Sequence, residues 1–135
     1  MLAALTDRVY ALIRIVTGLM FAFHGQQKLI GWLMPHPKPP VGSQIWIGGI
    51  LELTCGLLIA AGFFGRLAAF IASGMMAVAY WQFHVFGGKT EGIGRFIPGV
   101  NGGELAAVYC FLFLFMACKG SGPLSIDAHR GKKAA

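Results

Sequence analysis

The sequence predicts an all-α integral membrane protein, a four-helix bundle with both termini in the cytoplasm. Of its 135 residues, 56% are hydrophobic and only 12% are charged, and the mean hydropathy is +0.68. These values suit lipid rather than water as the surrounding solvent. Four apolar runs approach the length of about 20 residues that crosses a hydrocarbon core. Segments rich in glycine or proline, which end helices, separate the runs.

The four expected helices span residues 9–30, 43–63, 67–86 and 103–118. The loops between them are a stiff, proline-rich segment (34–42), a tight turn (62–66) and a glycine-rich segment (87–103). The last of these is long enough to cover one end of a bundle. Residues 1–120 therefore form one transmembrane domain, and residues 121–135 form a polar, basic cytoplasmic tail without apolar periodicity.

The distribution of lysine and arginine predicts the orientation. Seven lie near the N-terminus, in the tight turn and in the tail, against four near the first and third loops. This excess places both termini in the cytoplasm of a bacterial or archaeal cell, with the chain crossing the inner membrane several times. Arg8 and Arg14 interrupt the first run, which favours a signal anchor over a cleaved signal peptide. The net charge of +6 fits anionic lipid head groups, so membrane lipids are the expected partners and nucleic acid is not.

The cysteines and the acidic residues do not indicate a metal centre. Cys55, Cys110 and Cys118 form no CxxC pair and no metal-finger spacing, so they are interpreted as small core residues, with a redox thiol pair as the alternative. Two histidines and two glutamates would be a plausible ligand set. However, neither Glu52 nor Glu104 belongs to the Glu-x-x-His pattern of di-iron bundles, and no metal is expected.

The first helix carries a stripe of polar and small residues on an otherwise apolar surface. At about 100° per residue, one arc contains Arg14, Thr17, Gly18, Phe21, His24, Gly25 and Lys28. Lipid offers polar groups no hydrogen-bonding partner, so the stripe is expected to face the bundle interior. Gln26 and Gln27 lie off it and are expected at the outer rim, near head groups.

Counting residues inward from the outer boundary predicts a polar cluster in the outer half of the bundle. Its members are His24, Lys28, Glu52, His84 and Glu104. Because a buried carboxylate is costly without a partner, Glu52 is expected to pair with Lys28, His24 or Arg14. Glycines 48, 49 and 56 share the face of Glu52 and would let another helix approach closely.

Several of these residues also have a purely structural interpretation. Tyr80 and Trp81 could be interfacial anchors or could stack on a ligand. Asn101 and Glu104 have capping-box spacing at the start of the fourth helix. Lys28 could extend to head groups and Arg14 could anchor the inner face. The two histidines and the Glu52 pair could serve packing alone.

The order and spacing of these residues resemble the DoxX family of small four-helix membrane proteins. The resemblance runs from about Arg14 to Asp127 and rests on the segments "RIVTGLMFAFHGQQKLIG", "GGILELTCGLLIAAGFFGRLAAFIASGMMAVAYWQFH", "NGGELAAVYCFLFLF" and "GPLSIDA". The family is named for a subunit of a quinone-linked oxidase system. The resemblance therefore implies a quinone- or redox-linked subunit of a membrane oxidoreductase system, with a quinone as cofactor.

The residues are compatible with that implication, since a quinone site needs an apolar slot, aromatic walls and groups that exchange protons. In this hypothesis Glu52 accepts protons and His24 or His84 hydrogen-bonds a ring oxygen. Ligand-binding roles are expected for Lys28, Glu104, Asn101, Tyr80, Trp81 and Arg14.

Two other functions are open at this point. A non-catalytic scaffold could recruit a soluble redox partner through the basic tail, and a carrier could move a lipid or another small molecule. No haem, flavin or iron–sulfur motif is visible, so an electron-transfer role requires a partner protein. Small-xxx-small spacings, Ala68/Ala72 and Ala69/Ser73, are compatible with a homodimer.

Overall fold

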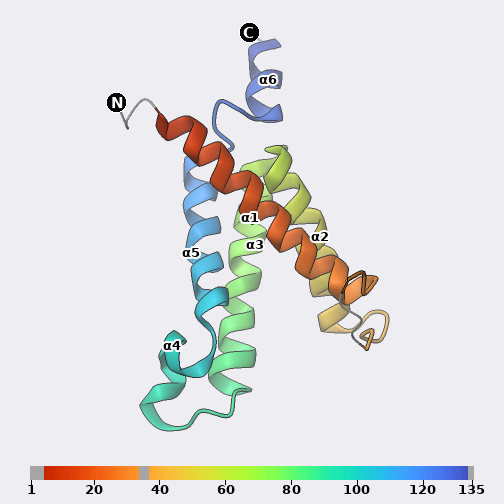
Figure 1. Ribbon diagram of the computed structural model, residues 1–135, viewed down its shortest axis with the longest axis vertical. Helices are drawn as coiled ribbons and strands as arrows, with labels where there is room; N and C mark the ends of the chain where they lie inside the picture. The colour runs from red at the N-terminus through yellow and green to blue at the C-terminus, as the bar shows by residue number, and fades with distance from the viewer. Residues whose placement is uncertain (1–4, 34–36, 134–135) are drawn as a thin grey trace.

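The computed structural model describes residues 5–33 and 37–133, which form helices and connecting segments without any strand. In order, the elements are α1 (Thr6–Leu29), α2 (Gln44–Ala61), α3 (Gly65–Ala79), a π-helix (Tyr80–Phe86), a 3₁₀-helix (Gly92–Phe96), α4 (Pro98–Asn101), α5 (Glu104–Lys119) and α6 (Ile126–Lys133). Figure 1 shows α1 beside α2 and α3 beside α5, with α6 beyond one end of these helices.

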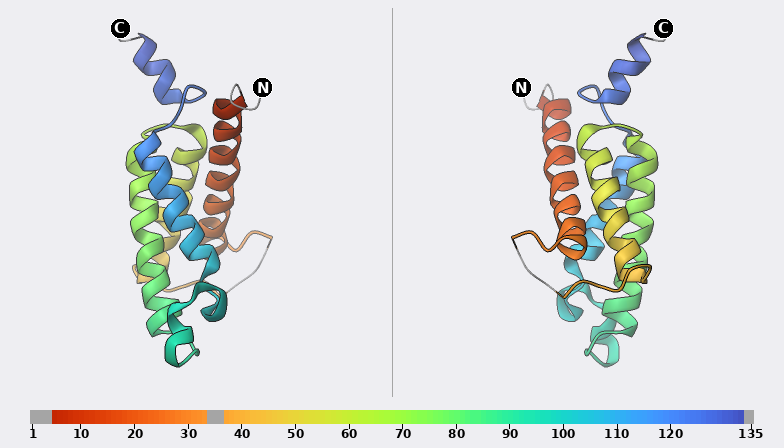
Figure 2. Two further views of the ribbon diagram at one scale, coloured as in Figure 1. Left: turned by 90° about the vertical axis from the view of Figure 1, so that its left-hand side faces the viewer. Right: turned by 90° about the vertical axis from the view of Figure 1, so that its right-hand side faces the viewer.

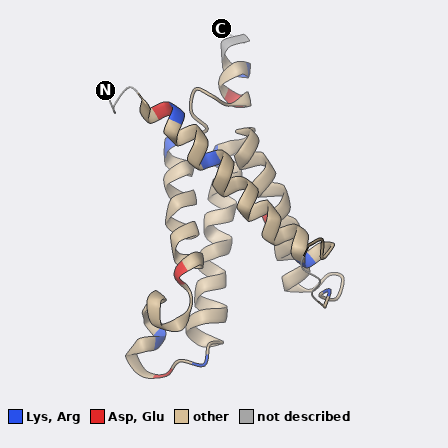
Figure 3. Ribbon diagram, in the orientation of Figure 1, with Lys and Arg blue, Asp and Glu red and all other residues tan. Residues whose placement is uncertain are grey.

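Three of the helical segments have membrane-spanning length and composition. They are α1, α2, and α3 together with the π-helix, which continues it to Phe86. The helix α5 is also apolar, but its 16 residues are few for crossing a membrane. Large apolar side chains such as Leu12, Phe70 and Phe111 are exposed, as expected for a surface that faces hydrocarbon. Charged residues lie mainly at helix ends and in loops (Figure 3).

The helices pack in sequence, α1 on α2, α2 on α3 and α3 on α5. Aromatic side chains connect α1 to α5. The ring of Phe21 lies 5.5 Å from that of Tyr109 and 4.8 Å from that of Phe113 between centroids. Phe21, Phe113 and Ile59 are almost completely buried and form the centre of the core. The start of α1 and the last helix, α6, lie at the same end of the molecule (Figure 2).

Glycines allow α1 and α2 to approach each other closely. A Cβ atom at Gly18 would lie 2.7 Å from the Gly56 carbonyl oxygen, and one at Gly56 would lie 2.5 Å from the Ala22 nitrogen. Gly25 faces Leu53 in the same way. The expected role of Gly56 is therefore confirmed. Gly48 has open space around it and takes no part in this contact.

Arg14 connects three segments at the end of the molecule near the N-terminus. Its guanidinium donates hydrogen bonds to the carbonyl oxygens of Ile59 (3.0 Å) and Ala60 (3.2 Å), at the end of α2. It also donates to the Leu124 carbonyl oxygen at 2.6 Å. With only 2% of its surface exposed, Arg14 is a buried cross-link between α1, α2 and the segment before α6.

Asp127 holds α6 against the start of α3. Its carboxylate accepts hydrogen bonds from the backbone N–H groups of Phe64 and Gly65, both at 3.0 Å, and from the Ser121 hydroxyl at 2.7 Å. Burial alone would raise the pKa of Asp127, but these hydrogen bonds and nearby Arg130 outweigh it, so the pKa lies below its usual value. The segment expected to be a tail is therefore attached to the helices by its first half.

Apart from shifts of one to three residues at the helix ends and the helix α6 in the predicted tail, the structure differs from the predicted elements in two places. The third helix was expected to be regular to Phe86, but after Ala79 it continues as a π-helix, whose wider turn changes the direction in which each side chain points. The third loop contains the 3₁₀-helix and α4. Ala68, Ala69, Ala72 and Ser73 are buried in the core, where Ser73 donates to the Cys110 carbonyl oxygen of α5. These small residues therefore serve contacts within the chain, and the expected homodimer would need another surface.

Candidate functional site

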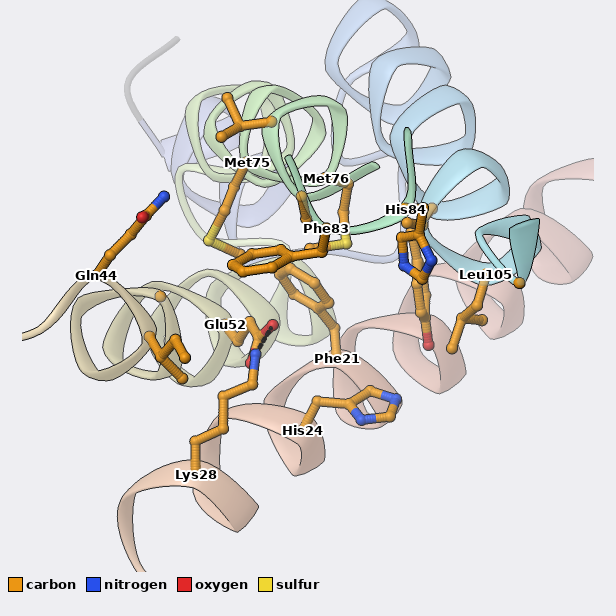
Figure 4. Close-up of a pocket in the computed structure, with 17 residues that line it drawn as sticks. Phe21, His24, Lys28, Gln44, Glu52, Met75, Met76, Phe83, His84 and Leu105 are labelled. Carbon is orange, nitrogen blue, oxygen red and sulfur yellow. Dashed lines mark hydrogen bonds and ion pairs between the residues drawn. The ribbon is translucent and has the colours of Figure 1, made fainter. Parts of the chain in front are cut away.

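A cavity of about 510 Å³ lies between α1, α2, α3 and α5, at the end away from α6. Apolar side chains form most of its walls, and Phe21 and Phe83 point into its centre (Figure 4). The polar residues that line it are His24, Lys28, Gln44, Glu52, His84 and Tyr109. The sequence predicted four of these six to lie together, namely His24, Lys28, Glu52 and His84.

Glu52 and Lys28 form an ion pair at one side of this cavity. The Lys28 ammonium lies 2.6 Å from Glu52 Oε1, and Figure 4 shows the lysine side chain extending from α1 to α2. Of the three partners expected for Glu52, the structure selects Lys28. Glu52 is only 5% exposed, so the nearby cation offsets much of the cost of burying its carboxylate.

Two buried polar atoms in the cavity wall have no hydrogen-bonding partner among the described residues. They are the second carboxylate oxygen of Glu52, Oε2, and the hydroxyl of Tyr109. Such atoms are rare in folded proteins, because each costs about 1–3 kcal/mol when unsatisfied. Both residues line the same cavity, and because the two atoms are themselves buried, each side chain must turn toward the cavity to hydrogen-bond a small molecule there.

Tyr109 was not predicted as a site residue. A signal was present, since Tyr109 lies three residues after Ala106 and four before Phe113 and therefore shares their inward face. Its hydroxyl is the one polar group on that buried face of α5 in the described structure.

The two histidines lie in the cavity wall on different helices. His24 comes from α1 and is one turn before Lys28, whereas His84 comes from the π-helix. His84 stacks on Tyr80 and its Nδ1 lies 3.4 Å from the Asn101 carbonyl oxygen. His24 makes no hydrogen bond among the described residues. Both rings are therefore available to a ligand, and their proposed roles stay predictions.

Glu104 does not join the cluster. It is exposed at the first position of α5, whereas Leu105, Ala106 and Tyr109 line the cavity. At about 100° per residue, Glu104 lies roughly 150° around the helix from the mean direction of those three. Depth along the helix was predicted correctly, but the direction of the side chain was not.

Tyr80, Trp81 and Asn101 form a separate group beside the cavity. Tyr80 donates to the Phe96 carbonyl oxygen at 3.0 Å, and Asn101 donates to the Tyr80 hydroxyl at 3.2 Å. Trp81 is half-exposed and packs on Tyr80. None of the three lines the cavity. Asn101 ends α4 and does not cap α5, whose preceding residue is Gly103, so the expected capping box is not formed.

Two further expectations about α1 are corrected. Arg14 cannot contact the cavity, because ten residues separate it from His24 and correspond to about 15 Å along the helix. Gln26 lies in the last turn of α1 but is only 9% exposed, and its side chain donates to the Trp32 carbonyl oxygen at 3.0 Å instead of extending to head groups. Within residues 5–33 and 37–133 no three histidine, cysteine or acidic side chains are placed to hold a metal ion.

Several apolar helices of membrane-spanning length, packed around a cavity that contains a buried ion pair, define a helical membrane protein with an internal cavity. The chain belongs to the DoxX family, whose model matches residues 9–85. It is also 37% identical over 126 residues to an uncharacterized protein of Haemophilus influenzae, covering 91% of each chain. No solved structure shows significant similarity to it.

Proposed function

We propose that this protein is a quinone-binding subunit of a membrane oxidoreductase system and that the cavity beside Glu52 holds the quinone ring. In this proposal the chain crosses the inner membrane as a four-helix bundle with cytoplasmic termini. A second redox protein exchanges electrons with the ring. The observation that carries the proposal is that two residues with an unsatisfied buried polar atom, Glu52 (Oε2) and Tyr109 (the hydroxyl), line the same mostly apolar cavity.

The donor and acceptor suit the two forms of such a ring. A quinone presents carbonyl oxygens, which accept a hydrogen bond from the Tyr109 hydroxyl. Its reduced form presents hydroxyl groups, which donate to Glu52 Oε2. When bound, the ring supplies two-electron, two-proton chemistry that the side chains lack.

The other residues of the cavity orient the ring and control charge. Phe21 and Phe83 offer aromatic faces in the centre of the cavity, against which a planar ring can stack. Lys28, whose ammonium lies 2.6 Å from Glu52 Oε1, balances the charge of a carboxylate in apolar surroundings. His84, on the π-helix, is placed to donate to or accept from a second ring oxygen.

The test is extraction of bound small molecules from the full-length protein purified in mild detergent, followed by mass spectrometry. Wild-type protein should contain an isoprenoid quinone, and Glu52→Gln should contain about tenfold less, equivalent to about 1.4 kcal/mol. Glu104→Gln is the matched control, because Glu104 is exposed and lies outside the cavity. Equal quinone in both variants, or only phospholipid in the wild type, would contradict the proposal.

A scaffold function is the second candidate, and the position of α6 favours it. Asp127 and Arg14 attach the segment that begins with Leu124, so α6 extends from the helices with Arg130 exposed. A charge reversal, Arg130→Glu, should then abolish recruitment of a soluble redox partner without changing the extracted quinone. Recruitment that survives Arg130→Glu would exclude this surface.

A further inference from the structure

A second cavity, of about 500 Å³, lies beneath the proline-rich loop that joins α1 to α2. Three of its lining residues, His24, Lys28 and Ile45, also line the cavity beside Glu52, which is called the ligand cavity from here on. The two spaces therefore share one wall.

The two cavities differ in their position relative to the solution. Both are lined mostly by apolar atoms, and the second adds Gln27, Lys38, Ser43 and three prolines to the shared residues. Pro37, Lys38 and Pro40 are exposed, so the second cavity borders the solution on the outer side of the helices.

Lys28 belongs to both environments. Its side chain is 38% exposed, yet its ammonium contacts a Glu52 side chain that is almost completely buried. His24, one turn earlier on the same helix, is half-buried. The two nitrogen-containing side chains of His24 and Lys28 therefore lie between Glu52 and the second cavity.

We propose that the cavity beneath the proline-rich loop is the aqueous vestibule of the ligand cavity, and that Glu52 exchanges protons with solution through the wall formed by His24 and Lys28. The remaining titratable groups that face the two cavities are Lys38, His84 and Tyr109. The opposite end of the helices offers no comparable route, because Arg14 is buried there between α1, α2 and the segment before α6.

The identity of the protonated ligand rests on the proposed function, but the aqueous connection itself does not. It can be measured with the full-length protein in lipid nanodiscs and a charged methanethiosulfonate reagent. In that reaction a cysteine thiolate attacks the reagent sulfur, a disulfide forms and a sulfinate leaves. The background variant replaces Cys55, Cys110 and Cys118 by alanine, and retained helix content shows that it folds.

Two glycines form a matched pair of positions for the introduced cysteine. Gly48 lines the ligand cavity, Gly74 is exposed on α3, and neither has an atom within 4 Å of an added Cβ. Lys38→Cys, in the vestibule, is the positive control. Because the reagent and the thiolate both need water, Gly48→Cys should react at least about tenfold faster than Gly74→Cys.

Closing the shared wall should then separate the two cavities. His24→Trp or Ile45→Trp should slow the reaction at Gly48→Cys by about tenfold and leave Lys38→Cys unchanged. Equal rates at Gly48→Cys and Gly74→Cys would overturn the connection, and a rate that neither tryptophan lowers would overturn the assignment of the wall. Neither result depends on whether quinone is found by extraction, so failure of the two proposals is distinguishable.

Discussion

Replacing Gly56 by alanine should push α1 away from α2, whereas the same change at Gly48 should not. A Cβ atom at Gly56 would lie 2.5 Å from the Ala22 nitrogen and 2.6 Å from the Gly18 carbonyl oxygen. Ordinary contacts begin at 3.4 Å, so the backbone of α1 must move by about 0.9 Å. Backbone atoms cannot yield by changing rotamer, so the cost falls on the whole helix contact.

The two variants should change stability in opposite directions. Overpacking of this kind typically costs about 1–3 kcal/mol, and alanine recovers about 0.5–1 kcal/mol relative to glycine within a helix. We expect Gly56→Ala to lose about 1–2 kcal/mol of unfolding free energy. Gly48→Ala should gain up to about 1 kcal/mol, because its Cβ meets no atom.

The assay is unfolding of the full-length protein in mixed micelles by increasing SDS, followed by circular dichroism of the helices. Gly56→Ala should unfold at a lower SDS fraction than wild type, and Gly48→Ala at the same or a higher fraction. If Gly56→Ala is as stable as Gly48→Ala, the close packing of α1 against α2 is wrong. The burial of the Glu52 side chain, which depends on that contact, would then be wrong too.

Three other substitutions test the polar groups. Lys28→Met should lower the unfolding free energy by about 3–5 kcal/mol in the same micelles, since it leaves the buried Glu52 carboxylate unpaired, and the double change with Glu52→Gln should recover most of the loss. Asp127→Asn should lower the unfolding free energy by about 1 kcal/mol at neutral pH. The folded-state pKa of Asp127 is lowered, so the stability that its carboxylate contributes is complete well above pH 3.8. This contribution is lost as the pH falls through the folded-state pKa. Stability of wild type and Asp127→Asn should therefore converge in acid, and a constant difference would contradict this. Tyr109→Phe should leave the ligand-free protein equally stable or up to about 1 kcal/mol more stable, because it removes an unsatisfied hydroxyl, yet it should lower extracted quinone; a loss of both would make the hydroxyl structural.

Periodicity alone predicted the inward face of α1. The polar and small residues from Arg14 to Lys28 share one arc, and lipid cannot satisfy their polar groups, so their direction was determined locally. The pairing of Lys28 with Glu52 followed from the cost of burying a carboxylate. His24 and His84 were placed by depth, which depends only on the rise per residue.

Long-range contacts could not be predicted from periodicity. Arg14 lies on the inward arc but binds the end of α2 and the Leu124 carbonyl oxygen, a contact that depends on where the chain returns after α5. Glu104 failed because it was placed by depth alone, whereas its direction around α5 depends on how residues 98–103 lead into the helix, which periodicity does not give. The π-helix likewise changes the direction of Trp81, and no local pattern in the sequence indicated it.

The most direct test of the central claim is a structure of the protein determined with a short-chain quinone. The account predicts the ring in the cavity between α1, α2, α3 and α5, with a ring oxygen within about 2.6–3.2 Å of Glu52 Oε2 or of the Tyr109 hydroxyl. A ring bound elsewhere, or a cavity that holds only lipid at saturating quinone, would contradict it.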